Sequence, residues 1–162
     1  YNKFLRFVAS PACEPGLVVI PSAKNKPVLG VKPDGKGDIS ESKSHLRWRR
    51  GRDTSDVPTP VIHDGLLYLA RENGVMIVMD AMSGKEVYLQ RVHRNRQRAS
   101  PVIADGKLYL AARHGEVCVL KLGREFKVIS RNVMKDGIAA TPAISGGRIY
   151  LRTYKSLYAI GK

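Results

Sequence analysis

Histidine and cysteine are the most reactive side chains in this sequence, and their spacing predicts neither a catalytic site nor a metal site. The four histidines lie in separate predicted turns or strand ends, without the HxH or HxxxH spacing that holds a metal ion. Cys13 and Cys118 match no CxxC or CxxH pattern, so we expect two buried, unpaired thiols. No paired carboxylates, nucleophile elbow or phosphate-binding glycine loop supports a reaction. We therefore predict no catalytic residue, no cofactor and no metal ligand. The histidines are His45, His63, His93 and His114.

Positive charge is the strongest chemical signal in the sequence. Its 162 residues include 28 Lys and Arg against 14 Asp and Glu, a net charge of +14. Such a charge steers a protein toward polyanions, anionic membrane surfaces or acidic proteins. The segment RVHRNRQRASP at 91–101 holds Arg91, Arg94, Arg96 and Arg98 within eight positions. Composition alone favours a nucleic-acid-binding arm. The alternative is a loop within a regular fold, and the position of the segment in the fold decides between the two.

An internal repeat accounts for most of the chain. A Ser/Thr-Pro pair recurs four times, with prolines 49, 41 and 41 residues apart, and a glycine follows five residues after each proline. Each unit continues with apolar runs such as LLYLA or KLYLA, and no segment shows a convincing ten-residue helical stripe. A period of 40 to 50 residues with short strands is typical of a β-propeller, whose blades are four-stranded antiparallel sheets. The pairs are Ser10-Pro11, Thr59-Pro60, Ser100-Pro101 and Thr141-Pro142, and the glycines are Gly16, Gly65, Gly106 and Gly147.

We predict an all-β propeller with about four blades, each with strands A to D. Strand A begins at the proline, and an x-Asp/Gly-Gly turn leads into strand B. The first unit has eight extra residues, which we assign to a solvated loop at 32–45 between strands C and D. Trp48 then falls in strand D, where we expect it to pack between blades. The units are 9–57, 58–98, 99–139 and 140–162, with 1–8 as a strand of a preceding or closing blade.

The second unit resembles a known family. Its sequence TPVIHDGLLYLARENGVMIVMDAMSGKEVYLQ is similar to the PQQ-like (pyrroloquinoline-quinone-like) propeller repeat, which is also found in BamB-type outer-membrane assembly lipoproteins. Tyr88 stands where the family usually has Trp, and the third unit has KLGRE in place of the Asp-Ala turn. Over residues 9–162 the pattern is similar to PQQ-like propeller proteins of planctomycete-type bacteria. The matching residues are Pro60, Gly65, Tyr68, Gly74, Asp80, Ala81, Ser83, Gly84 and Lys85.

This resemblance implies a fold and an exported, periplasmic location, but not a quinone cofactor. Quinoprotein dehydrogenases use an adjacent cysteine pair, a stacking tryptophan and a carboxylate beside a calcium ion. The chain has no adjacent cysteines, and its single tryptophan, Trp48, falls in an outer-strand pattern. We therefore expect no bound quinone. No apolar run approaches the length of a membrane-spanning helix, so we also expect no membrane span.

Most of the excess positive charge lies on one face of the predicted propeller, which we call the basic face. In an antiparallel blade, the B–C loops and the D–A connections emerge on this face. The A–B and C–D loops emerge on the opposite face. The basic face holds fifteen Lys or Arg against four Asp or Glu, and the opposite face holds six against eight. It comprises residues 22–26, 49–58, 70–74, 91–99, 111–115, 130–140 and 152–156. The leading candidates for binding an acidic partner are Arg49, Arg50, Arg52, Arg91, Arg94, Arg96, Arg98, Arg113, Arg152 and Lys155. For any single arginine, simple solvation of a loop is the alternative.

The number of blades leaves two ways to close a ring. Residues 1–8 can complete a four-bladed ring, or the chain is the C-terminal half of a ring of seven or eight blades. We favour the second, because the first residues resemble the middle of a blade. The remaining half of the propeller or a second copy of the chain would then complete the ring.

These features predict a noncatalytic propeller scaffold that mediates protein–protein interaction or complex assembly. We expect a protein partner with an acidic surface and no specific nucleic acid, because the loops contain no nucleic-acid motif and few aromatic side chains. One alternative is a fragment of a quinoprotein-type propeller enzyme whose catalytic residues lie elsewhere. Another is a module that binds polyanions without sequence preference.

Overall fold

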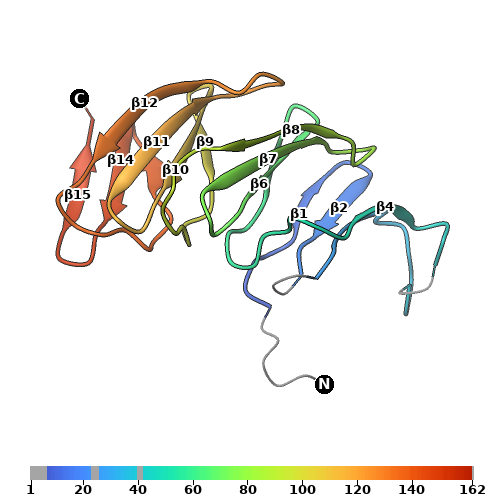
Figure 1. Cartoon of the computed structure of the whole chain (residues 1–162). Coiled ribbons are helices and arrows are strands. Elements are labelled where there is room, and N and C mark those ends of the chain that lie inside the picture. Colours follow the sequence, from blue (N-terminus) through green and yellow to red (C-terminus); the bar gives the residue numbers. More distant parts are fainter. Residues whose placement is uncertain (1–6, 23–25, 40–41, 162) are drawn as a thin grey trace.

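The protein is built of β-strands that form four antiparallel sheets (Figure 1). The structure is a computed structural model that describes residues 7–22, 26–39 and 42–161. Three of the sheets have four strands and the last has three, and the described residues form no helix. It follows that no helix in these ranges is long and apolar enough to cross a membrane. The predicted all-β propeller class is confirmed, and we call the sheets blades 1 to 4 in chain order.

Strands that are adjacent in sequence are adjacent in each sheet. Blade 1 contains β1 (Ala12–Glu14), β2 (Leu17–Ile20), β3 (Val28–Val31) and β4 (Leu46–Arg50). Blade 2 contains β5 (Val61–His63), β6 (Leu66–Ala70), β7 (Val75–Asp80) and β8 (Glu86–Arg91). Blade 3 contains β9 (Val102–Ala104), β10 (Lys107–Ala111), β11 (Glu116–Lys121) and β12 (Val128–Val133). Blade 4 contains β13 (Ala143–Ser145), β14 (Arg148–Arg152) and β15 (Leu157–Ile160).

The turn after the first strand of blade 2 has the geometry that its residues favour. His63 pairs with Leu66 across the turn, which leaves a two-residue loop. Asp64 and Gly65 in this loop have φ angles of 49° and 68°. Two positive φ angles define a type I′ hairpin, for which Asp-Gly is a preferred sequence. Blade 3 repeats the turn with Asp-Gly at 105–106, so the turn predicted from the sequence is confirmed in both blades.

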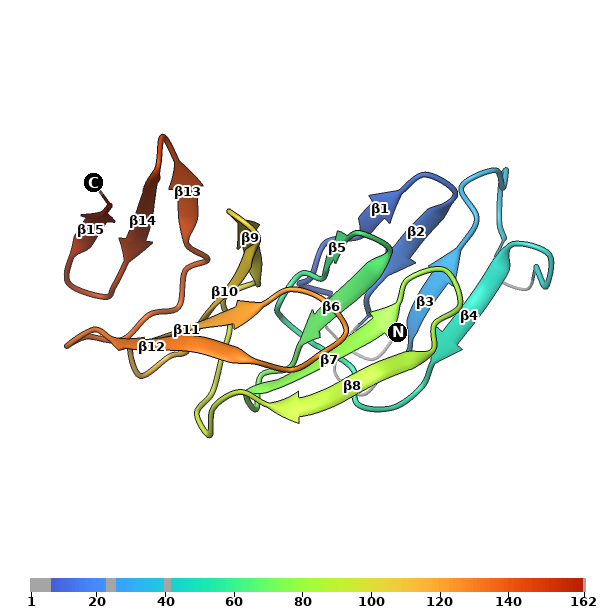
Figure 2. The same ribbon diagram turned by 90° about the horizontal axis from the view of Figure 1, so that it is seen from above.

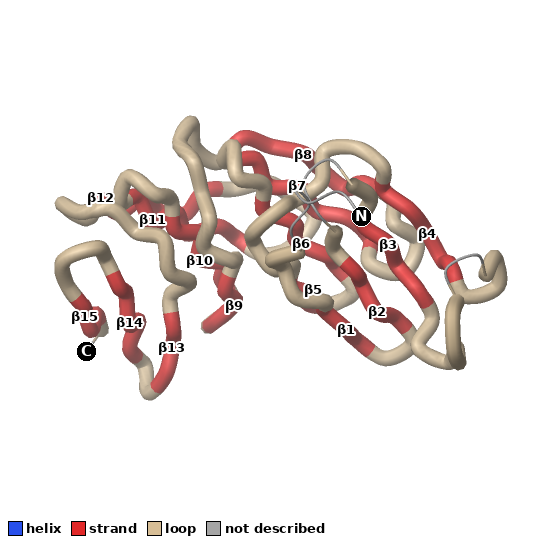
Figure 3. The backbone as a smooth tube through the Cα atoms, turned by 90° about the horizontal axis from the view of Figure 1, so that it is seen from below, coloured by secondary structure: helices blue, strands red, loops and turns tan. Residues whose placement is uncertain are grey.

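The blades follow one another along an arc. Figure 2 shows β1, β5, β9 and β13 on its concave side, with β4, β8 and β12 on its convex side and blades 1 and 4 at the two ends. Figure 3 shows the same order from the opposite side. Of the segment 1–8, which was expected to supply a strand, residues 1–6 lie outside the described residues. Phe7 and Val8 are exposed and belong to no strand.

The hydrophobic core lies between successive blades. Leu67 and Leu69 of β6 pack with blade 1, whereas Leu66 and Tyr68 of the same strand pack with blade 3. Because both of its faces are covered, β6 is buried along its whole length. Each blade therefore depends on its neighbours to bury its apolar side chains.

Trp48 packs between blades 1 and 2, as predicted. Its side chain on β4 is buried in the cluster that the two blades share. The indole Nε1 donates a hydrogen bond of 2.7 Å to the carbonyl oxygen of Ala81. The ring lies so close to Gly30 and Gly84 that a Cβ at either position would overlap it. An indole held in this way is not available to stack on a bound ligand.

The expectation of two buried thiols is wrong for Cys13. Both cysteines are unpaired, but Cys13 is exposed and only Cys118 is buried. Cys13 occupies the repeat position of Ile62 and Ile103, which pack against the cores formed with the preceding blades. No preceding blade exists within the described residues to cover Cys13. Burial raises the pKa of Cys118 to about 12, so this thiol is protonated at neutral pH.

Candidate functional site

Backbone hydrogen bonds hold the arginine-rich connection between blades 2 and 3 on both of its sides. Gln97 N donates to the carbonyl oxygen of Glu72 at 2.9 Å, on the loop between β6 and β7. On the other side, Arg113 N donates to the carbonyl oxygen of Arg96 at 2.8 Å, and Gln97 forms a β-bridge with Ala112. The connection is therefore a fixed part of the propeller and not a free arm.

The side chains of this connection alternate between solvent and interior. Arg94, Arg96 and Arg98 are exposed, whereas His93 and Gln97 are buried. No hydrogen bond or ion pair joins the three exposed guanidinium groups to another described residue. The ordered connection thus holds three positively charged side chains in solvent, and none of them pairs with another described residue.

His93 and Gln97 anchor the connection beneath these arginines. Their exposed fractions are 4% and 0%. His93 Nε2 lies 2.9 Å from Gln97 Oε1, and Gln97 Nε2 donates to the carbonyl oxygen of Ala99 at 3.1 Å. Because the amide nitrogen of Gln97 donates to Ala99, its amide oxygen must accept a hydrogen bond from His93. The ring proton of the neutral His93 therefore lies on Nε2. Burial is the main cause that lowers the pKa of His93, so the ring is neutral at neutral pH.

The lowered pKa of His93 makes stability depend on pH. Its contribution to stability is complete above the ordinary pKa of 6.5 and is lost as the pH falls toward the lower pKa of the folded protein. We expect wild type to lose more free energy of unfolding between about pH 7.5 and about pH 5.5 than His93→Asn, because asparagine does not titrate. Urea unfolding at both pH values measures the difference, with the more exposed His63→Asn as the matched control. An identical pH dependence for wild type and His93→Asn would contradict the prediction.

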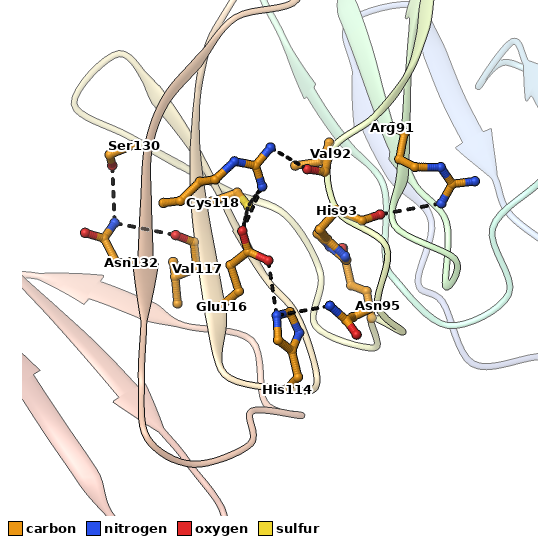
Figure 4. A network of polar contacts seen from close by, with 12 residues as sticks. Arg91, Val92, His93, Asn95, His114, Glu116, Val117, Cys118, Ser130 and Asn132 are labelled. Carbon is orange, nitrogen blue, oxygen red and sulfur yellow. Dashed lines mark hydrogen bonds and ion pairs between the residues drawn. The ribbon is translucent and has the colours of Figure 1, made fainter.

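A second set of contacts joins blade 3 to the end of β8 (Figure 4). Arg131 on β12 donates from Nη1 to Glu116 Oε1 and from Nη2 to the carbonyl oxygen of Val92, both at 2.7 Å. His114 Nε2 lies 3.1 Å from Glu116 Oε2 and 3.1 Å from Asn95 Nδ2. These contacts fix both ends of the segment 92–95 against blade 3.

Glu116 is ionised within this network. Its side chain is only 13% exposed, and burial by itself would raise its pKa. The hydrogen bonds from Arg131 and Cys118, together with the charge of Arg131, outweigh burial and lower the pKa below its ordinary value. The charge of Arg131 is therefore balanced by Glu116 within blade 3, while the bond from Arg131 to the carbonyl oxygen of Val92 links this blade to the segment after β8.

An open hollow of about 360 Å³ lies beside the network. Arg91 Nη1 donates to the carbonyl oxygen of Asn73 at 2.8 Å, and Arg131 is paired with Glu116. Among the lining arginines, Arg94 is thus the one whose side chain forms neither a hydrogen bond nor an ion pair with a described residue. Nowhere in 7–22, 26–39 and 42–161 do three or more His, Cys, Asp or Glu side chains gather as metal ligands would. The hollow is lined by Arg91, Val92, His93, Arg94, Glu116 and Arg131.

The other basic-face candidates differ in their contacts. The Arg50 side chain is 11% exposed and pairs with Glu86 of blade 2 at 2.9 Å. Arg113 Nη2 donates to Tyr154 Oη at 3.2 Å. Arg50, Arg91 and Arg113 are therefore engaged by other parts of the chain. Exposed candidates without a side-chain hydrogen bond or ion pair to a described residue are Arg49, Arg52, Arg94, Arg96, Arg98, Arg152 and Lys155.

Sequence reasoning missed Gln97, Glu116 and Arg131. Glu116 carried a usable signal, because it opens the apolar run VCVL and a carboxylate beside a buried strand needs a partner. Its partner Arg131 lies fifteen residues away on the next strand, so the pairing depends on strand register. Gln97 carried no comparable signal within a segment dominated by arginine.

The family is decided by a comparison with protein-family models. The model described as Outer membrane protein assembly factor BamB matches residues 37–125, which is more than half of the chain. The chain belongs to this family. A comparison with curated proteins gives no sequence match.

Solved structures similar to this BamB-family chain are propellers with little sequence identity to it. BamB from Moraxella catarrhalis has a TM-score of 0.76 and 15% identity, and the match covers 99% of this chain and 48% of that one. The computationally designed Ika4 protein has a TM-score of 0.74 and 10% identity, with 99% and 92% covered. The quinohemoprotein alcohol dehydrogenase ADHIIG from Pseudomonas putida HK5 has a TM-score of 0.71 and 11% identity, with 93% and 29% covered. The chain thus spans about half the length of the Moraxella BamB, and these similarities show the fold alone.

Proposed function

We propose that this chain is a noncatalytic propeller scaffold that binds an acidic surface of another protein through its basic connection. The observation that carries the proposal is the exposure of Arg94, Arg96 and Arg98 on a backbone held from both sides. A backbone that is already ordered loses less conformational entropy when a partner binds. Complementary charge also speeds association and selects against basic partners.

The hollow beside the connection supports the same function. Arg94 lines it and has no ion-pair partner among the described residues. An acidic side chain of a partner that enters there would meet Arg94, while the ionised Glu116, which also lines the hollow, would repel a second carboxylate. The site therefore suits a single Asp or Glu within an acidic surface.

Complex assembly in an exported compartment is the biological setting that we propose. The family description names an assembly factor of the outer membrane, and that role comes to this chain by analogy alone. We further propose a periplasmic location and that the four blades act as the C-terminal half of a larger ring. Detection of the native protein in a periplasmic fraction, and the mass of the intact native polypeptide, test these two points.

Reversal of three charges tests the basic connection. We expect Arg94→Glu, Arg96→Glu and Arg98→Glu together to weaken binding of a synthetic peptide rich in Asp and Glu by about tenfold or more at low salt. Fluorescence anisotropy with labelled peptide measures this, and wild-type binding should weaken as salt is added.

The matched control reverses three charges on the opposite face. Lys32, Lys36 and Lys43 lie in the loop between β3 and β4, and their replacement by Glu makes the same change in net charge. If both triple variants lose equal affinity, net charge and not the connection drives binding, and the proposal fails. Binding of mixed-sequence duplex DNA as tight as that of the peptide would favour the polyanion-binding alternative.

A further inference from the structure

The backbone of the connection between blades 2 and 3 is repeated in the connection between blades 3 and 4. Gln97 forms an antiparallel β-bridge with Ala112, and Ile138, at the same position of the next unit, forms the equivalent bridge with Thr153. Gln97 and Ile138 also donate their backbone N–H groups to the loop of the blade before, at 2.9 and 3.3 Å. The two connections therefore share their backbone structure at this point, although their side chains differ.

This fold does not require arginine beside the bridged residue. Arg96 and Arg98 flank Gln97, whereas the equivalent residues of the other two connections are small or apolar. Arginine is enriched at protein interfaces, so the two side chains are candidates for contact with a partner. The equivalent residues are Ser55 and Val57 before blade 2, and Gly137 and Ala139 before blade 4.

Contacts within the protein decide which side chains of the connection point into solvent. Asn95 Nδ2 lies 3.1 Å from His114 Nε2 of blade 3 (Figure 4), and Gln97 is buried. Successive side chains of an extended segment point to opposite sides, so Arg96 and Arg98 point together into solvent on either side of Gln97. Two residues of an extended segment span about 6.7 Å, which is the expected spacing of these two side chains along the backbone.

The acidic side chains near the connection are engaged elsewhere in the protein. Glu72 Oε1 accepts hydrogen bonds from two backbone N–H groups of the preceding connection, at 2.8 and 2.6 Å. Asp136 Oδ2 accepts from Lys155 N at 2.7 Å, and Glu116 is paired with Arg131. None of these carboxylates pairs with the exposed arginines, so the positive charge of the connection remains available to a partner.

The exposed arginines follow one another across the blade rather than forming a round cluster. The connection leaves β8 on the convex side of the arc and enters β9 on its concave side (Figure 2). Arg94 lines the hollow near the start of this path, and Arg98 lies two residues before Ser100 at its inner end. A partner segment that meets all the arginines must therefore lie along the connection.

We propose that the acidic partner binds as an extended segment along this connection, with carboxylates at alternate residues. Alternate side chains of an extended segment lie on one side at the same spacing of about 6.7 Å, so two carboxylates meet Arg96 and Arg98. A third carboxylate, toward the convex side, meets Arg94 beside the hollow. This inference rests on the proposed function, because it specifies the form of the acidic partner.

Two peptides of identical composition test this form of the partner. One peptide has glutamates at alternate residues, separated by threonines, and the other has the same residues with its glutamates consecutive. We expect wild type to bind the alternating peptide about fivefold more tightly at low salt, because the consecutive arrangement turns one carboxylate away from the arginines. Fluorescence anisotropy with labelled peptides measures both affinities.

A double variant locates the preference on the connection. Arg96→Ser with Arg98→Ala introduces residues that the other connections already have at these positions, so the fold should persist with an unchanged midpoint of urea unfolding. The preference for the alternating peptide should disappear. Arg49→Ala with Arg52→Ala is the matched control, because it removes the same charge from exposed residues of the same face and should keep the preference.

The outcomes separate this inference from the proposed function. Equal affinity of wild type for the two peptides, or an unchanged preference in Arg96→Ser with Arg98→Ala, would overturn the extended form and leave the acidic partner in place. If wild type binds neither peptide, the proposed function fails and this inference fails with it. Tighter binding of single-stranded oligothymidylate than of the alternating peptide would also overturn it, because the connection would then bind phosphates in preference to a protein segment.

Discussion

Replacement of Gly74 by alanine is expected to reduce the free energy of unfolding by about 3 kcal/mol or more. Gly74 has a φ of +80°, and a Cβ there would overlap the carbonyl oxygen of His93 and lie 2.6 Å from His93 Nδ1. The obstacle is backbone, so a side-chain rotation cannot relieve it. The carbonyl oxygen of Gly74 also accepts from Val92 N at 2.9 Å, so a shift at Gly74 would displace the start of the basic connection.

Gly65→Ala is the matched control for this prediction. Its φ is +68°, but no atom lies within 4 Å of the added Cβ. This variant should therefore show only the cost of a left-handed backbone, about 1 kcal/mol. Urea unfolding of both variants measures the difference. Equal losses would mean that the close approach of Gly74 to His93 does not contribute to stability.

Replacement of Gln97 by leucine is expected to reduce the free energy of unfolding by about 2 to 3 kcal/mol. Leucine is similar in size, but it leaves the N–H of His93 Nε2 and the carbonyl oxygen of Ala99 without their partner in the interior. Gln90→Leu on the exposed side of β8 is the matched control and should change stability by less than about 0.5 kcal/mol.

The pair His93 and Gln97 can also be tested together. If the hydrogen bond between them accounts for the loss, His93→Phe combined with Gln97→Leu should cost less than the sum of the two single changes. Strict additivity would show that each side chain acts through other contacts. A loss of peptide binding in Gln97→Leu, with the arginines intact, would further indicate that the anchor positions them.

The propeller could be predicted because its signals are local and repeated. Asp64-Gly65 favours a type I′ turn wherever it stands, and the proline before each first strand recurs at nearly constant spacing. A unit that departs from the pattern, such as the third with KLGRE in place of the Asp-Ala turn, is still identified by its proline and glycine spacing. Trp48 could also be assigned to packing between blades, since a large apolar side chain on an outer strand is usually covered.

The candidate site was harder to predict, because its contacts join residues that are distant in sequence. The ion pair of Arg50 with Glu86 crosses two blades, and the pairing of Arg131 with Glu116 depends on strand register. Cys13 has the same place in its repeat as buried isoleucines, yet it is exposed because no described blade precedes it. A residue-by-residue pattern does not contain this information.

The sequence by itself determined the all-β class, the repeat and the position of the arginine-rich segment between two blades. These properties follow from turn chemistry and from periodic apolar residues, which act over a few positions. Only the tertiary structure decided which charges are free: Arg94, Arg96 and Arg98 face solvent, while Arg50, Arg113 and Arg131 bind other parts of the chain. The physical reason is that a charge is neutralised by whatever lies within a few ångströms of it, and the packing of successive blades decides those neighbours.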